Sequence, residues 1–470
     1  MLFRNLFIAT LAALAFVGCS DDKDIIEPIP DGIGDVNVVF ATTSSEQTQT
    51  KAETGLTTTV YENFVPTESV KEYCLKTKIE DPEFVIDHLT VFVFDNNGGL
   101  VKTAYFKDQQ EETAGMNIPS AGEDANSISE FGGIVLKEGT YKFILAGNLT
   151  KDQITVGGGE TDFERYKAAT INWTGKTGIS TEIENTCLPM IKVLEGIKLT
   201  AHKLTATATL NLIGGDAKAV VPSAADDESK ISVTSAIQLT RLVARVQLKS
   251  LKFNWSVKDE NGNEVTHTPA ASITLQKVYL ANASNTSVLS GANTGSGYVH
   301  GFELGYDSKE TNKYYIPSGT ADATNLSKVS DKEDAIVNGN NGITWTNNND
   351  DTETALLPLS FYAFGKTIAD VGDEAQNPNL MLVLECSAAY TGGIAPSESV
   401  YYYVPVSNAT IKSIEPNKVY NVNVTLIGQG SDDLGKKQEK ANVNVGLSVG
   451  DWNDLVKIEI DPNPTPVPSK

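Results

Sequence analysis

The sequence predicts an all-β protein of two antiparallel β-sandwich domains, with further strands beyond them at the C-terminal end. Its 470 residues exceed what one hydrophobic core usually organises, so two domains of ordinary size fit better than one. Hydrophobic residues make up 40% of the chain, which is enough to form such cores. Short runs of alternating apolar and polar residues are separated by turn residues, without the regular strand–helix alternation of parallel α/β folds.

The first predicted domain begins with a short amphipathic strand. Apolar Val36, Val38 and Phe40 occupy alternate positions, which is the period of a strand that buries one face. Residues 95–98 (DNNG) follow an apolar run and have the composition of a hairpin turn. Further strands of this domain are expected at residues 89–94, 141–146 and 206–212.

The second predicted domain follows a polar loop, rich in Gly, Asp and Ser, at residues 214–230. We therefore assign residues 52–228 to an N-terminal domain and residues 229–430 to a C-terminal domain. Residues 259–262 (DENG) supply another turn, and the sequence has no repeat of fixed period. Strands of this domain are expected at residues 244–253, 272–280, 356–364, 380–386, 401–406 and 420–427.

The N-terminal residues resemble a bacterial lipoprotein signal. Arg4 precedes an apolar stretch at residues 6–17, which is too short to span a bilayer, and Gly18 then leads into Cys19. We predict a signal peptide at residues 1–18 and acylation of Cys19, which would anchor the chain to a membrane. The alternative is an ordinary signal peptide that happens to contain a cysteine.

Composition argues against several classes of function. Acidic residues outnumber basic ones by 60 to 37, giving a net charge of −23, so the chain lacks the basic face that nucleic-acid binding requires. The four histidines are not spaced with His, Cys or Glu as in a metal site. Besides Cys19, three cysteines remain, and they allow at most one disulfide: Cys74, Cys187 and Cys386. No phosphate-binding loop or nucleophile elbow occurs, so we expect no cofactor, no metal and no enzyme activity.

The C-terminal residues show the strictest alternation in the chain. A charged hinge at residues 431–440 precedes residues 441–449, in which every odd position is apolar: Val443, Val445, Leu447 and Val449. A strand with one apolar face needs a sheet edge and a groove. Periodicity alone favours its return to its own sandwich. The alternative is that it completes a neighbouring subunit by strand addition.

Five segments together resemble the fimbrillin family of Bacteroidales, the type V pilins. They match, in order, an L-P-M segment, the R-x-x-A-[RK] entry to the second domain, an N-x-x-Y-x-[VI]-x-[VIL] strand, its G-x-G exit, and a last strand ending in Trp. The corresponding residues here are Leu188–Met190, Arg241–Val246, Asn417–Val424, Gly428–Gly430 and Ala441–Trp452.

This resemblance implies a transthyretin-like fold and a mechanism of assembly. A family member is a lipoprotein exported to the cell surface, where an Arg- or Lys-specific protease cuts it after its first strand. Here the cut would fall between Lys51 and Ala52, since Lys51 is the only basic residue between Lys23 and Lys71. Residues 19–51, a propeptide carrying the tether and the first strand, would then leave.

The vacated groove would accept the C-terminal strand of another subunit. That donor strand would present Val443, Val445, Leu447 and Val449, followed by Trp452, from the segment at residues 431–470. Repetition gives a head-to-tail homo-polymer that also contacts other fimbrial subunits. The implied function is a structural subunit, of the stalk rather than the tip, in a surface fimbria for adhesion or biofilm formation.

A second function remains open from sequence. A lipid-tethered, β-rich protein could instead bind glycans for a polysaccharide-uptake system at the outer surface of the cell. Its ligand platform would be the four Trp residues and the run Tyr401–Tyr403, although packing within a strand explains that run as well.

Overall fold

The protein was analysed as a computed structural model. The described residues are 34–44, 59–61, 73–75, 86–107, 128–172, 188–202, 208–221, 231–233, 235–258, 261–267, 270–281, 283–284, 286–290, 298–299, 343–346, 353–367, 380–390, 397–407, 410–427, 430 and 443–451. Cys19, Lys51, Ala52 and Trp452 lie outside these ranges. Within the described residues, no helix combines the length and apolar character needed to cross a membrane.

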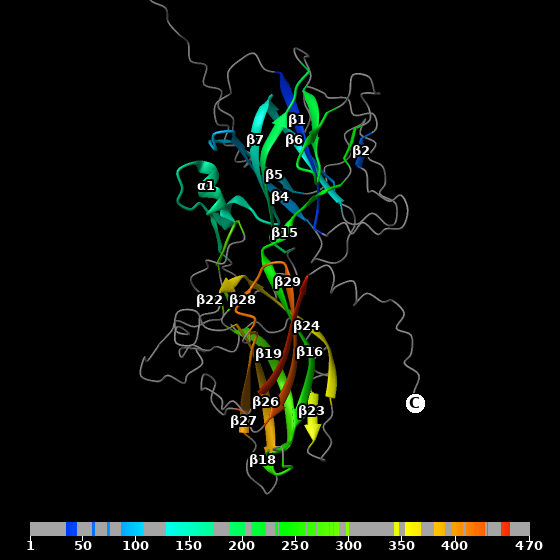
Figure 1. Cartoon of the computed structure of the whole chain (residues 1–470), viewed down its shortest axis with the longest axis vertical. Helices are drawn as coiled ribbons and strands as arrows, with labels where there is room; N and C mark the ends of the chain where they lie inside the picture. The colour runs from blue at the N-terminus through cyan, green and yellow to red at the C-terminus, as the bar shows by residue number, and fades with distance from the viewer. Residues whose placement is uncertain are drawn as a thin grey trace, which may run out of the picture.

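Two sheets form the upper body in Figure 1, here called the first sheet pair. The six-stranded sheet has the order β12-β11-β1-β6-β3, with β14 also paired to β1, and the five-stranded sheet has the order β15-β10-β7-β4-β5. Their bounds are β1 Asp35–Thr43, β3 Tyr73–Leu75, β4 His88–Asp95, β5 Leu100–Lys107, β6 Ile128–Lys137, β7 Gly139–Gly147, β10 Met190–Leu199, β11 Thr209–Ile213, β12 Ala219–Val220, β14 Ile237–Gln238 and β15 Thr240–Arg241.

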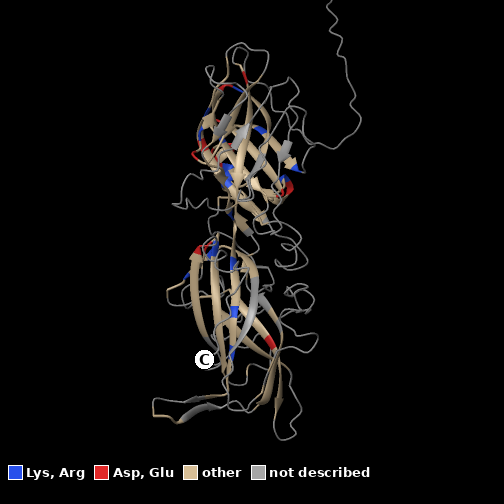
Figure 2. Cartoon of the chain, turned by 90° about the vertical axis from the view of Figure 1, so that its right-hand side faces the viewer, with Lys and Arg blue, Asp and Glu red and all other residues tan. Residues whose placement is uncertain are grey.

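The second sheet pair forms the lower body, and Figure 2 shows the two bodies arranged along the long axis. Its six-stranded sheet has the order β22-β20-β24-β16-β29-β30, and its four-stranded sheet has the order β23-β19-β26-β27. Their bounds are β16 Val243–Asn254, β19 Ala270–Ala281, β20 Ala283–Ser284, β22 Tyr298–Val299, β23 Ile343–Thr346, β24 Glu353–Phe364, β26 Met381–Tyr390, β27 Ser397–Pro405, β29 Lys418–Ile427 and β30 Val443–Asp451.

Shorter elements complete the described chain. One of them, the sheet β21-β9-β8, joins a strand of the lower body to strands of the upper one, because β21 pairs with β9. The bounds are β2 Thr59–Tyr61, β8 Ile154–Thr155, β9 Thr170–Asn172, β13 Ile231–Val233, β17 Ser256–Lys258, β18 Glu264–His267, β21 Thr286–Val288, β25 Lys366–Thr367, β28 Ser413–Ile414, the α-helix α1 Asp162–Lys167 and the 3-10 helix η1 Lys151–Gln153.

The sheets of each pair pack face to face through aromatic side chains. Phe40 of β1 meets Phe143 of β7 edge to face, with ring centroids 5.3 Å apart. In the second sheet pair, Phe253 of β16 meets Tyr402 of β27 at 6.4 Å. Apolar residues at alternate positions therefore point between two sheets, as in a β-sandwich, which confirms the all-β sandwich prediction.

Both sheet pairs follow one strand order. Strands β1, β4, β5, β6, β7, β10, β11 and β12 correspond in turn to β16, β19, β23, β24, β26, β27, β29 and β30. In each pair the first strand runs parallel to the penultimate one and antiparallel to its other neighbour. Each large sheet thus contains parallel pairing, β1 with β11 and β14 in the first and β16 with β29 in the second, which the prediction of purely antiparallel sheets did not include.

The predicted strands and turns are largely found, while the domain limits remain predictions. Gly98, with a φ of 90°, closes the turn at residues 95–98 by donating its amide hydrogen to the Asp95 carbonyl oxygen. β14 and β15 follow the predicted boundary at residue 228, yet they pair with β1 and β10 of the first sheet pair. The chain therefore enters the second sheet pair at Leu242.

Candidate strand-exchange site

Strand β1 is held on both edges in the middle of its sheet. It runs parallel to β11 and antiparallel to β6, with the register placing Val36 beside Thr209 and Leu136. Every residue from Val36 to Ser44 is buried. The apolar face predicted from Val36, Val38 and Phe40 is therefore found, and it belongs to the core of the first sheet pair.

Burial of β1 contributes strongly to this sheet pair. Val36, Val38, Val39 and Phe40 have no exposed surface, and large apolar side chains contribute roughly 1.5–3 kcal/mol each when fully buried. Their gross contribution is therefore about 6–12 kcal/mol before ordering costs. Main-chain pairing along two edges adds to it. Removal of β1 would leave a long apolar slot between β11 and β6.

The other face of β1 carries an unusual buried amide. Asn37 has no exposed surface, and among the described residues neither its amide oxygen nor its nitrogen has a hydrogen-bond partner. Its register neighbours are Leu210 of β11 and Val135 of β6, which offer no side-chain hydrogen bond. An unpaired buried polar group costs about 1–3 kcal/mol, so Asn37 reduces the free energy that β1 gains from its place in the sheet.

Strand β30, drawn in red in Figure 1, lies at the edge of the second large sheet. It pairs antiparallel with β29 alone, which places Leu447 beside Val422 and Val445 beside Val424. Val445 and Leu447 are partly buried against the core, whereas Val449 is 40% exposed. The strand predicted from alternation is present and returns to its own sandwich in this chain.

The outer end of the β29–β30 pair is closed by an ion pair between Lys418 and Asp451. Both side chains are exposed to solvent, and such surface pairs contribute about 0–1 kcal/mol. Half-buried apolar side chains on β30 contribute roughly half of their full value, or about 2–4 kcal/mol in total. β30 is therefore held much less firmly than β1.

Three of the segments that carry the fimbrillin resemblance meet where the two sheet pairs join. Arg241, almost fully buried at the end of β15, donates from Nη1 to Oδ1 of Asn417 at 3.3 Å. Asn417 adopts a φ of 58° and donates its amide hydrogen to the carbonyl oxygen of Val243. The amide of Leu242 in turn donates to the carbonyl oxygen of Pro189. These motif residues thus have a structural role at the junction.

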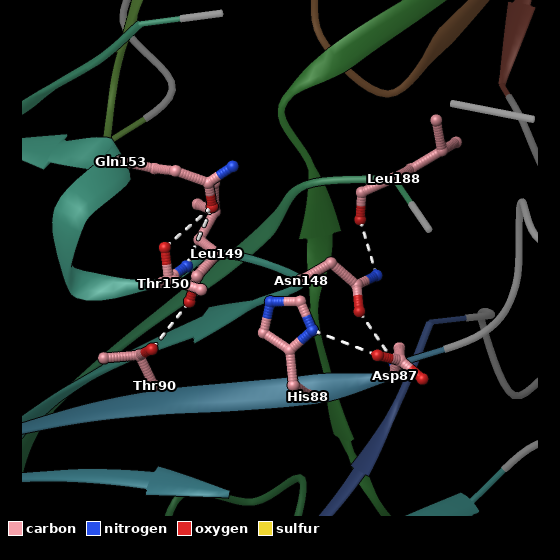
Figure 3. Close-up of polar contacts among 8 residues, drawn as sticks. All are labelled: Asp87, His88, Thr90, Asn148, Leu149, Thr150, Gln153 and Leu188. Carbon is pink, nitrogen blue, oxygen red and sulfur yellow. Dashed lines mark hydrogen bonds and ion pairs between the residues drawn. The ribbon is translucent and has the colours of Figure 1, made fainter. Parts of the chain in front are cut away.

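Figure 3 shows a polar cluster in the first sheet pair that includes Leu188, the chain neighbour of Pro189. Oδ1 of Asn148 accepts the amide hydrogen of Asp87 at 2.7 Å, and its Nδ2 donates to the carbonyl oxygen of Leu188 at 2.7 Å. The hydroxyl of Thr90 donates to the carbonyl oxygen of Leu149. Each contact satisfies a backbone group where strands end, so the cluster ties β4, β7 and β10 together.

Among the described residues, no group of His, Cys, Asp and Glu could hold a metal ion. His88 lies 3.2 Å from the carboxylate of Asp87, which is its chain neighbour. Burial raises the pKa of the Cys386 thiol, which makes it a poor nucleophile. Burial also lowers the pKa of Lys366 to about 7.

The aromatic run considered as a glycan platform lies inside the second sheet pair. Tyr402 and Tyr403 are buried in β27, and Trp255 is buried as well. Their rings are therefore not presented to solvent, and packing within the strand accounts for the run. The described residues thus give the glycan-binding alternative no ligand platform at Tyr402 or Tyr403.

Several predicted site residues are not brought together in this chain. Val36, Val38 and Phe40 lie in the first sheet pair, whereas Val445, Leu447 and Val449 lie in the second. Sequence reasoning did not find the Arg241–Asn417 contact, because the two residues are 176 positions apart. The only signal in the sequence is that each residue belongs to a segment resembling the fimbrillin family.

No protein-family model matches the chain, and no curated protein matches it either. Among solved structures, a Parabacteroides distasonis protein assigned to cell adhesion is 17% identical, covers 90% of this chain and 100% of its own, and has a TM-score of 0.46.

Two proteins of Porphyromonas gingivalis are similar as well. The fimbrilin FimA is 14% identical, with 89% of this chain and 98% of that chain covered and a TM-score of 0.46. The tip fimbrial protein Mfa3 is 13% identical, with 89% and 100% covered and a TM-score of 0.40. Because these scores lie below 0.5, we argue function from this chain's own strands. In structure, the chain is similar to fimbrial proteins of Bacteroidales.

Proposed function

We propose that the chain is a structural subunit of a cell-surface fimbria that assembles by strand exchange and serves adhesion or biofilm formation. The observation that carries this proposal is the contrast between two strands of equal length. β1 fills the centre of one sheet and precedes Lys51, while β30 lies loosely at the edge of another sheet. A removable strand and a donor strand are the two parts that such assembly needs.

Delivery to the surface is the first step. Acylation of Cys19 tethers the precursor to the outer membrane, with β1 seated in its sheet and the slot closed. Because β1 is fully buried, the precursor is folded and does not polymerise prematurely. The lipid serves as a transport handle for the subunit.

Cleavage after Lys51 is the second step. β1 ends at Thr43, and Lys51 follows only a few residues later in the sequence. A cut there separates β1 and Cys19 from the subunit, which then begins at Ala52. Cleavage alone does not empty the slot, because β1 remains held by non-covalent contacts along two edges. An incoming strand must therefore compete with β1.

Donation by β30 is the third step. To leave its own sheet, β30 gives up its pairing with β29 alone. Its apolar residues alternate as those of β1 do: Val443, Val445, Leu447 and Val449. In the slot it is paired on two edges instead of one and is fully buried, which offsets the loss of its pairing with β29. The acceptor slot and the donor strand lie on different sheet pairs, so each subunit can accept at one end and donate at the other. This arrangement gives an open head-to-tail filament, as expected for a stalk subunit.

The proposal is tested with three variants of the cleavage site in the bacterium that makes the protein. The unaltered chain should give a ladder of heat-labile polymers on an unheated denaturing gel, and Lys51→Gln should abolish it, because β1 stays covalently attached. Lys51→Arg should retain the ladder if the protease accepts either basic residue. Lys71→Gln, which alters the next basic residue, is the matched control and should assemble normally. A normal ladder from Lys51→Gln, with Cys19 still acylated, would contradict the proposal.

A further inference from the structure

We infer that β30 of a second copy of this chain enters the slot in the same direction as β1, with Val443 in the place of Val36. This register then puts Val445 in the place of Val38, Leu447 in the place of Phe40 and Val449 in the place of Thr42. The inference rests on the proposed strand exchange and specifies its geometry.

The two strands share a short sequence in this register. Val36-Asn37-Val38 of β1 aligns with Val443-Asn444-Val445 of β30, and the large apolar Phe40 aligns with Leu447. Each strand has nine residues, and in this register β30 covers the positions of β1 from Val36 to Thr43. Because β1 pairs with β11 and β6 along this length, the side chains of β1 define which sites an incoming strand must fill.

The largest pocket in the slot selects this register. Phe40 is fully buried and packs on Phe143, so a small residue there would leave a cavity. Leu447 is the largest apolar residue on the face of β30. A shift by two positions in either direction puts Val445 or Val449 into that pocket.

Each shifted register has a further cost. One shift places Ala441 at the fully buried site of Val36, which would be underfilled. The opposite shift places the carboxylate of Asp451 at the buried site of Thr42, within β1, whereas the proposed register places it at Ser44, beyond the last residue of β1. Burial of an uncompensated charge is strongly unfavourable.

The reversed direction is disfavoured by the same pockets. With Leu447 at the Phe40 site, a reversed strand brings Asp451 to the buried site of Val36. With Val449 at the Val36 site instead, Val445 occupies the Phe40 pocket. Only the direction of β1 combines Leu at the Phe40 site with Val at the Val36 and Val38 sites.

The outer face also agrees with this register. The register puts Asn444 at the site of Asn37, between Val135 and Leu210, so the exchange replaces one amide by another and adds no new cost there. Val135 is 43% exposed and lies opposite that site, which makes it a suitable place for a reporter. Further along β6, Glu130 lies opposite Ala41, whose site Ser448 would take.

Disulfide trapping in assembled fimbriae tests the inference, because directly opposed strand residues are close enough to form the bond. The background carries Cys74→Ser and Cys187→Ser. Val135→Cys combined with Asn444→Cys, and Glu130→Cys combined with Ser448→Cys, should each convert the heat-labile ladder into a heat-stable ladder that a reductant reverses. The swapped pairs, Val135→Cys with Ser448→Cys and Glu130→Cys with Asn444→Cys, should not.

The outcomes separate this inference from the proposed function. Trapping only in the swapped pairs, or only with Asn442→Cys or Gly446→Cys opposite Val135→Cys, overturns the register and leaves strand exchange intact. Assembled fimbriae that trap in none of these pairs overturn the register, and they overturn strand exchange as well if their subunits still contain β1. As a second measurement, Leu447→Phe should raise the temperature at which the ladder dissociates and Leu447→Ala should lower it. A higher dissociation temperature from Val445→Phe instead overturns the register.

Discussion

Strands β1 and β30 have the same length and the same alternation, yet they lie in opposite environments. β1 is paired on two edges and is buried from Val36 onward, whereas β30 is paired on one edge and leaves Val449 partly exposed. Amphipathic pattern therefore does not determine how firmly a strand is held. The number of paired edges and the depth of burial do.

The shared topology of the two sheet pairs makes this comparison more informative. β30 is the counterpart of β12, a two-residue strand beside β11, and β16 is the counterpart of β1. β16 is joined by the chain to β15, while β1 precedes the predicted cut. Under the proposed mechanism, the first strand of one sheet pair is therefore permanent and that of the other is removed. Four predictions test this difference.

The largest effect is expected from truncating the central aromatic of β1. Phe40→Ala should lower the free energy of unfolding of the uncut chain by about 3–5 kcal/mol, because a fully buried side chain is lost. Leu447→Ala in the half-buried β30 should cost only about 1–2 kcal/mol. Urea denaturation of both variants measures the difference. Equal losses would mean that β30 is held as firmly as β1.

A second prediction concerns the pH dependence of stability and a buried lysine that follows β24 in the chain. Lys366 lies in β25, and burial lowers its pKa to about 7, well below its ordinary value. Between pH 7 and 9 the unfolded chain therefore binds more protons at this site than the folded chain does, so stability rises with pH. The gain should be about 2 kcal/mol in denaturant titrations.

Lys366→Met should remove this pH dependence, because methionine fills a similar volume without titrating. Phe40→Ala, in the first sheet pair, should retain the dependence and serves as the control. If stability between pH 7 and 9 responds equally with and without Lys366, the buried amine is not its source.

A smaller effect is expected from the buried amide of β1. Asn37→Val should stabilise the uncut chain by about 1 kcal/mol, since it removes an amide without hydrogen-bond partners from a buried site. It should also slow assembly after cleavage, because β1 competes better for its slot. Denaturation and the rate of ladder formation measure the two effects. Faster assembly would show that Asn37 does not weaken the binding of β1 to its sheet. Val39→Ile, on the same face of β1, is the control for a change in side-chain volume alone.

The smallest effect is expected at the end of β30. Lys418→Gln should lower the stability of the subunit by less than about 1 kcal/mol, because the ion pair with Asp451 is exposed to solvent. It should nevertheless accelerate release of β30, measured by hydrogen exchange of its amides in the subunit before assembly. Raising the salt concentration should reproduce the effect in the unaltered chain. An unchanged exchange rate would show that the ion pair does not slow the release of β30 from β29.

The sequence predicted those features that depend on alternation within one segment. Both β1 and β30 were found in this way, with the correct apolar face, because the period of a strand is local. Alternation does not reveal which strand lies alongside, so the parallel neighbours of β1 and β16 could not be predicted.

Long-range contacts explain most of what sequence reasoning missed. Asn37 has a polar side chain and would be expected on a solvated face, yet both faces of β1 are buried. The contact of Arg241 with Asn417 depends on how two sheet pairs meet. The shared topology is also hidden in sequence, since the corresponding strands β12 and β30 have two and nine residues.

The central claim is that β1 is replaced during assembly. Mass spectrometry of subunits released from purified fimbriae by heating measures this most directly. We predict that every polymerised subunit begins at Ala52 and that no peptide from Asp35–Thr43 accompanies the polymer. Polymerised subunits that still contain this strand, attached to an acylated Cys19, would contradict the account.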